Sequence, residues 1–213
     1  MTIFKELDWS AIKFHYEERR KAHQVLTQLH ADCQLLKFAE LAVGCIDPTG
    51  NYSAHQHRLG PRILGLNSKA DQRIYELASR FLSINSASEV PALIREAGLK
   101  YLGISVGSEI SCMMRPSLCW VTNTRTVWAY LLVKCDFNVG KANDALDAYK
   151  IGDEESEMAY SLWTAIHGDM EREMREICRL GTIAALASGI QSGEFEFLWA
   201  DAISNEMYDK YRA

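Results

Sequence analysis

Apolar residues recur at intervals of three and four along most of the chain, which is the spacing of one helix face. The clearest run covers residues 9–43, where an apolar stripe is formed by Ile12, Tyr16, Val25, Leu29, Leu36, Leu41 and Val43. Only the segment LKYLGISV, residues 99–106, is a candidate for a short strand. The pattern therefore predicts an all-α protein.

Capping residues and glycines divide this pattern into separate helices. Asp8, Ser68 and Ser88 are predicted N-caps, and Gly44 and Gly98 are predicted stops. The predicted helices are 9–43, 69–83, 89–98, 106–114, 124–134, 139–150, 154–187 with a break near Gly168 or Gly181, and 194–211. Residues 45–68 are predicted to be a long loop, and a loop of that length in a compact domain is usually functional or mobile.

Composition and length place the chain among globular proteins. With 213 residues, 48% of them hydrophobic, it can form one domain of two lobes. No apolar run has the length of a membrane span, and the N-terminus lacks a signal pattern, so we expect a cytoplasmic protein. The six cysteines form no C-x-x-C pair. We therefore expect neither a metal nor a cofactor.

Charge is distributed unevenly along the chain, although the net charge is −5. Residues 51–125 carry 9 basic and 5 acidic side chains, whereas residues 126–213 carry 8 basic and 16 acidic ones. This asymmetry is compatible with an anionic partner for the basic middle part. It is equally compatible with acidic helices in the C-terminal part that simply face water. Arg19, Arg20 and Lys21 are interpreted as an exposed helix face.

Residues 99–128, LKYLGISVGSEISCMMRPSLCWVTNTRTVW, combine two predicted helices with a short connection and a polar cluster. Gly103 in the connection is expected to adopt a backbone conformation that a larger residue would resist. The unpaired N–H groups of a helix start bind an anion such as phosphate without reading sequence. Trp120 and Trp128, which flank the polar cluster, are interpreted as core residues.

This segment resembles the helix-hairpin-helix DNA glycosylase superfamily, the group of endonuclease III and the adenine-mismatch glycosylases. Gly103 in KYLGIS stands at the second hairpin glycine, and the position of the family's catalytic Asp falls twenty residues later, at Asn123 in VTNTRTVW. Tyr101 replaces the first hairpin glycine, and Ser105 occupies the position of the lysine found in lyase-competent members. The resemblance covers about residues 88–135 and implies a monofunctional enzyme on a two-lobed helical fold with a central helix-hairpin-helix.

The resemblance implies catalytic and DNA-binding residues. Asn123 would position a water, and Asp136 or Glu109 would supply the missing negative charge, although each is also interpretable as an ordinary helix-end residue. A loop from the middle of the chain would fill the gap left by a flipped base. The implied DNA contacts are Tyr101, Gly103, Ser105, Gly107, Arg125, Tyr52, His55, Gln56, His57, Arg58 and Arg62.

Some of these residues have alternative interpretations. The segment 51–62 is equally compatible with a solvated loop, and Arg125 with either a phosphate or an acidic helix. His55 and His57 have no acidic or cysteine neighbour, so we expect no metal there.

Three functions follow from this reasoning. The first is a DNA glycosylase of base excision repair or antiviral defence, which acts as a monomer on double-stranded DNA. Its substrate would be a damaged or modified base, such as the modified bases of viral genomes. The second is a catalytically silent DNA-binding protein on the same fold. The third is an all-α interaction protein.

Overall fold

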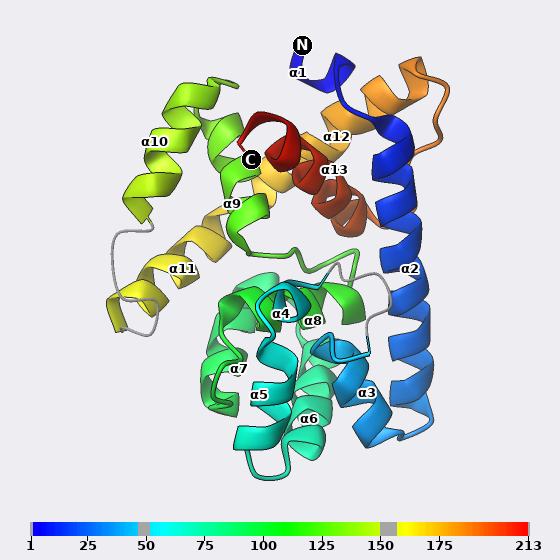
Figure 1. Cartoon of the computed structure of the whole chain (residues 1–213), viewed down its shortest axis with the longest axis vertical. Helices are drawn as coiled ribbons and strands as arrows, with labels where there is room; N and C mark the ends of the chain where they lie inside the picture. The colour runs from blue at the N-terminus through cyan, green and yellow to red at the C-terminus, as the bar shows by residue number, and fades with distance from the viewer. Residues whose placement is uncertain (1, 47–51, 150–156, 213) are drawn as a thin grey trace. The chain divides into compact units, whose positions relative to one another are not determined.

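The computed structural model describes residues 2–46, 52–149 and 157–212 (Figure 1). Within these ranges the chain forms helices, turns and no strand, so the predicted all-α class is confirmed. The strand candidate at 99–106 is instead a helix connection followed by the first turn of a helix. Contacts divide the chain into two compact units, unit 1 with residues 1–17 and 122–213 and unit 2 with residues 18–121.

The boundary between the two units, after residue 17, falls within the long helix α2, Trp9–Ala31. Asp8 caps it as predicted, because its carboxylate accepts hydrogen bonds from the backbone N–H groups of Ser10 and Ala11 at 2.9 and 3.0 Å. The predicted helix 9–43 is wrong in its length. The chain turns at Cys33, whose φ of 53° is left-handed, and a separate helix α3 follows at Leu35–Ala42.

Unit 2 is built around helix α6, Ala70–Ser83, which packs against α3, α5, α7 and α8. Its other elements are α4 (Ser53–Gln56), α5 (Leu59–Leu66), the 3₁₀ turn η1 (Ala87–Glu89), α7 (Val90–Ala97) and α8 (Ile104–Met114). The helices α4 and α5 correct the expectation of a continuous loop over 45–68. Fully buried Phe38, Ile74, Phe81 and Ile110 contribute to the core.

Two predicted caps in unit 2 are replaced by other residues. Helix α6 begins after Lys69, in a left-handed conformation with φ of 50°, and not with Ser68 as its N-cap. Ser86, not Ser88, caps η1, and Glu89 accepts a hydrogen bond from the Ser86 backbone to complete a capping box. Gly98 ends α7 with φ of 57°, as predicted.

Unit 1 is built around helix α13, Glu196–Tyr211, which packs against α9 and α12. Residues 197–204 of α13 are all buried, including Trp199. The other helices of the unit are α1 (Thr2–Lys5), α9 (Thr124–Lys134), α10 (Val139–Tyr149), α11 (Glu157–Asp169) and α12 (Glu171–Ala187). The predicted break near Gly168 is therefore confirmed to within two residues, and Gly181 lies inside α12.

The two units differ in charge. Unit 2 carries 12 basic and 9 acidic side chains, whereas unit 1 carries 11 basic and 19 acidic ones. Their net charges are +3 and −8. In the described ranges, the structure has no helix that combines the length and the apolar character of a membrane span.

Candidate nucleic-acid interface and catalytic site

The connection between α7 and α8 differs from the expectation at Gly103. This glycine has φ of −86° and ψ of −168°, an extended conformation open to every residue. The left-handed residue is Tyr101, with φ of 66°. A side chain at Gly103 would meet nothing within 4 Å, so the start of α8 is sterically open there.

The first turn of α8 presents backbone N–H groups ahead of the first intrahelical hydrogen bond. That first bond runs from the N–H of Gly107 to the carbonyl of Gly103, at 2.9 Å. The N–H groups of residues 104–106, which include the half-buried Ser105, therefore point beyond the helix start. Because its own N–H is used within the helix, Gly107 does not belong to such an anion site.

Gly107 instead allows α7 and α8 to approach closely. It is buried, and a Cβ built on it would lie 2.5 Å from Ile94 Cγ1 of α7. Real Cβ atoms do not make contacts of that length. The expectation that Gly107 contacts DNA is thus corrected to a packing role.

Tyr101 and Arg62 come together at this connection from separate segments of unit 2. The Arg62 guanidinium carbon lies 3.8 Å from the centre of the Tyr101 ring, and Arg62 is exposed on α5. Asn67, directly after α5, fixes the two segments together. Its side chain accepts from the Lys100 N–H at 2.9 Å and donates to the Lys100 carbonyl at 3.1 Å.

The segment 52–58 contributes less than expected to this surface. His55, His57 and Arg58 are exposed, and His55 Nδ1 lies 3.2 Å from the carbonyl oxygen of Gly44. Tyr52 is only 1% exposed, with the Arg19 guanidinium carbon 4.8 Å from its ring centre. Tyr52 is therefore not a surface residue available for base stacking. Residue 51 and the side chain of Gln56 lie outside the described part of the chain.

Glu109 forms a buried ion pair with Arg19, and both side chains are 2% exposed. Arg19 Nη2 donates to Glu109 Oε1 at 2.7 Å. Because α8 begins at Ile104, Glu109 lies in its second turn and not in the first turn as expected. Arg19 likewise is not part of an exposed face. A signal for its burial was present, since Arg19 continues the stripe of Ile12 and Tyr16 at helical spacing.

Asn123 is the N-cap of α9 in unit 1. Its side-chain oxygen accepts hydrogen bonds from the backbone N–H groups of Arg125 and Thr126 at 3.0 and 3.1 Å. The Thr126 hydroxyl in turn accepts from the Asn123 N–H at 3.0 Å, which completes a capping box. Before the helix, the buried Thr122 hydroxyl lies 2.6 Å from His167 Nδ1, a contact that the sequence did not suggest.

Arg125 contacts the acidic helix α13, which is one of the two alternatives that the sequence left open. Its Nη1 donates to Asp209 Oδ1 at 2.5 Å, and its guanidinium carbon lies 5.3 Å from the centre of the Tyr208 ring. Side-chain exposures of 26% and 52% leave this pair accessible to water.

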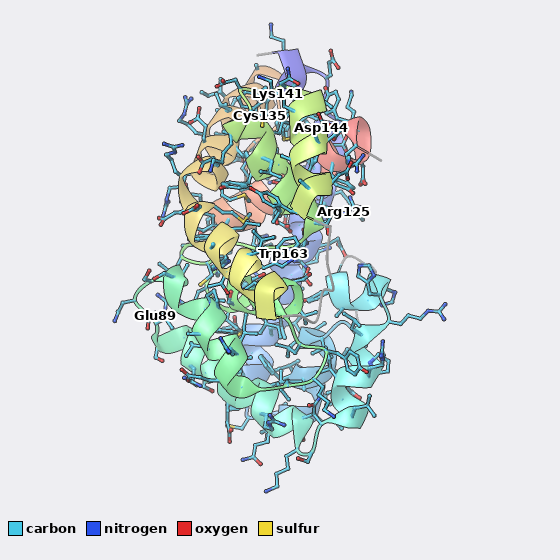
Figure 2. The ribbon with its side chains drawn as sticks, turned by 90° about the vertical axis from the view of Figure 1, so that its left-hand side faces the viewer. Glu89, Arg125, Cys135, Lys141, Asp144 and Trp163 are labelled. Atoms are coloured by element: carbon cyan, nitrogen blue, oxygen red, sulfur yellow. The ribbon has the colours of Figure 1, made fainter. Side chains whose placement is uncertain are left out.

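Asp136 does not share a site with Asn123, because the two lie at opposite ends of α9. The 11 residues of that helix span about 16 Å. Figure 2 shows Arg125 near one end of the helix and Cys135 at the other. Asp136 is exposed in the following turn, with φ of 52°.

Within the described residues, no three His, Cys, Asp or Glu side chains are grouped as metal ligands.

Comparison with known proteins identifies no relative of this chain. Neither the models of protein families, nor the curated proteins, nor the solved structures contain a match to the chain. The resemblance to helix-hairpin-helix glycosylases thus rests on the motif alone.

Proposed function

We propose that this protein binds double-stranded DNA through unit 2 and hydrolyses the N-glycosidic bond of a flipped, modified base. The observation that carries the proposal is the arrangement of Arg62 and Tyr101 beside the open start of α8. It offers a cation, an aromatic ring and unpaired backbone N–H groups on one surface of the basic unit. Each of these is a group that binds nucleic acid without reading its sequence.

The contacts with DNA would be made to its phosphate backbone. The N–H groups of residues 104–106 and the positive end of the α8 dipole favour a phosphate oxygen. Exposed Arg58, Arg62 and Lys100 add positive charge in the same unit. Arg125 is not included, since Asp209 already balances its charge.

The reaction would take place at the start of α9. In this proposal Asn123 orients a water by hydrogen bonding, with its amide N–H group as donor, because its oxygen already caps the helix. An amide bears no charge and cannot stabilise a cationic sugar as a carboxylate does. A carboxylate from elsewhere in unit 1 is therefore needed.

The test is an assay for abasic sites. Wild-type protein and Asn123→Ala are incubated with genomic DNAs that carry different base modifications, and abasic sites are counted. Sites made by the wild type and not by the variant support the proposal. Tight DNA binding without abasic sites on any substrate contradicts the enzymatic part.

A catalytically silent DNA-binding protein is the second candidate. The observation that favours it is the capping box at Asn123, which gives this residue a structural duty sufficient to explain its presence. This candidate predicts DNA binding that Asn123→Ala leaves intact in a folded protein. An interaction protein, the third reading, predicts no DNA binding at low salt.

A further inference from the structure

Tyr101 occupies a backbone position that suits glycine and disfavours tyrosine. The Leu102 N–H donates to the Leu99 carbonyl at 3.1 Å and closes a four-residue turn in which Tyr101 is the third residue. Its φ of 66° is left-handed, and glycine is the usual residue at a left-handed third position of a turn. Backbone strain of this kind is concentrated at functional sites. A function of the tyrosine side chain would therefore explain its presence here.

The surrounding structure holds the turn in this conformation. Leu99 and Leu102, at its two ends, are buried. The side chain of Asn67 fixes Lys100 through both its N–H and its carbonyl. Tyr101 thus cannot relax to a common backbone conformation unless these contacts break. Its half-buried ring is therefore presented in a fixed position.

The Tyr101 ring supports the guanidinium group of Arg62. The guanidinium carbon lies 3.8 Å from the ring centre, which is a close cation–π contact. Within the described ranges the ring is the one partner of Arg62, and no carboxylate there neutralises its charge. Arg80 on α6 of the same unit, by contrast, forms an ion pair with Glu96. Arg62 is thus oriented by an aromatic ring and keeps its charge available for a ligand.

The surface next to this pair is open. Gly65 follows Arg62 by three residues on α5 and lies on the same side of the helix. A Cβ built on Gly65, or on Gly103 after the turn, would meet nothing within 4 Å. Leu66, the next residue of α5, is 59% exposed. Because Arg62 is itself exposed, a planar group can reach the outer face of its guanidinium.

A guanidinium that is supported by an aromatic ring is suited to stack on a nucleobase. Arginine planes and aromatic rings both stack on bases, and every base has a face for such a contact. A base inside an intact duplex is already stacked on its neighbours. We propose that Arg62 and Tyr101 form a stacking platform for an unpaired base of DNA, so that unit 2 prefers a duplex with a bulged base. This inference rests on the proposed function, because it takes DNA as the ligand and names the form that is preferred.

The experiment measures the affinity of the complete protein for two duplexes at one salt concentration. They share one sequence, and the second has an extra, unpaired adenine in one strand. The ratio of the affinity for the bulged duplex to that for the paired duplex is the base preference. We expect a base preference of at least about ten for the wild type, which is within the range for stacking of one base.

Two substitutions remove the platform and keep the charge of unit 2. Tyr101→Gly deletes the ring and should fold, because glycine suits the left-handed backbone and this relief offsets the lost ring contact. Arg62→Lys keeps the positive charge but lacks the planar group that stacks. Each should reduce the base preference to about one and leave the affinity for the paired duplex within about threefold of wild type. A contact of Arg62 with phosphate alone would instead tolerate lysine.

Two further variants serve as controls. Tyr101→Phe retains the ring and should keep the base preference. Cys33→Gly is the matched control for the backbone change, because Cys33 is an exposed residue of unit 2 with a left-handed φ of 53°. It should keep the base preference as well. Circular dichroism and urea unfolding confirm that each variant is folded.

The outcomes distinguish this inference from the proposed function. If the wild type binds both duplexes equally, or if Tyr101→Gly or Arg62→Lys keeps the base preference, the platform is overturned while DNA binding by unit 2 stands. Loss of the base preference in Tyr101→Phe or Cys33→Gly also overturns it, because the effect would not depend on the stacked pair. If the wild type binds neither duplex at low salt, the proposed function fails, and the platform fails with it.

Discussion

At the scale of single residues, Asn123 caps helix α9 and has a proposed role in catalysis. Substitutions at this position can distinguish the two roles. Asn123→Asp keeps an oxygen for the two N–H groups and places a negative charge at the favourable end of the helix. We predict unchanged or slightly higher stability and a rate of abasic-site formation at least about tenfold above wild type, since a carboxylate stabilises a cationic sugar.

Asn123→Ala removes both functions at once. The free energy of unfolding should fall by about 0.5–2 kcal/mol, as for other lost N-caps, and abasic-site formation should cease. Urea unfolding and the abasic-site assay measure the two effects on the same samples. An Asp variant no faster than wild type would show that charge at this position does not limit the reaction.

A second residue-scale prediction concerns Cys119. Burial raises the pKa of its thiol to about 11, above that of an ordinary cysteine. The folded state therefore favours the neutral thiol, and the corresponding stability is present below pH about 9 and lost as the pH rises towards 11. We predict a declining free energy of unfolding across this window, by at most about 1.4 kcal/mol per pH unit for this one group.

Cys119→Ala should flatten part of this decline. Cys178, with its pKa likewise raised to about 11, contributes in the same window. The measurement is denaturant unfolding at several pH values, with parallel curves for variant and wild type expected between pH about 6 and 8. An equal slope for both proteins above pH 9 would contradict the assignment to Cys119.

At the scale of elements, the spacing of α7 and α8 depends on Gly107. Gly107→Ala places a methyl group against Ile94 and should lower the free energy of unfolding by about 1–3 kcal/mol, the usual cost of overpacking. Ile94→Ala in the same chain makes room for that methyl group. The double variant should therefore be more stable than the sum of the two single effects, and strict additivity would argue against the close contact.

Gly103 at the start of α8 allows a more specific test of the proposed phosphate contact. Space is open there, and the backbone conformation suits any residue. Gly103→Asp and Gly103→Asn should both cap α8 and leave stability equal to or above that of wild type. Only Asp brings a negative charge to the proposed phosphate. We predict that Asp weakens binding to duplex DNA by at least about tenfold and that Asn does not. Equal affinities for the two variants would exclude this helix start as the grip.

Sequence periodicity identified the helices well where caps and glycines mark their ends. Helix α9 matches its predicted range of 124–134, because Asn123 is a strong N-cap signal. Helix 9–43 was predicted too long because the turn between α2 and α3 uses Cys33 in a left-handed conformation. Neither glycine nor asparagine, the residues that usually indicate a left-handed conformation, is present at this turn.

The candidate site was less predictable, because it depends on contacts between distant segments. The pairing of Arg62 with Tyr101, and of Arg19 with Glu109, joins residues that no local pattern connects. Local spacing also cannot show which of Gly103 and Tyr101 has the unusual backbone conformation.

At the scale of the whole molecule, the opposite charges of the two units determine how a polyanion would approach. Unit 2 has a net charge of +3 and unit 1 of −8. Long-range attraction should therefore favour first contact of DNA with unit 2, even though the chain as a whole is acidic. This asymmetry would allow the proposed binding of DNA through unit 2 despite the net charge of −5.

The measurement that tests the account most directly is the affinity of the complete protein for duplex DNA as a function of salt. With three to four phosphates neutralised by unit 2, log K should fall with log salt at a slope of about −3, a loss of more than about tenfold between about 50 and 200 mM salt. Arg62→Gln should make that slope shallower by about one. Absence of binding at the lowest salt, or an affinity that salt does not change, would contradict the account.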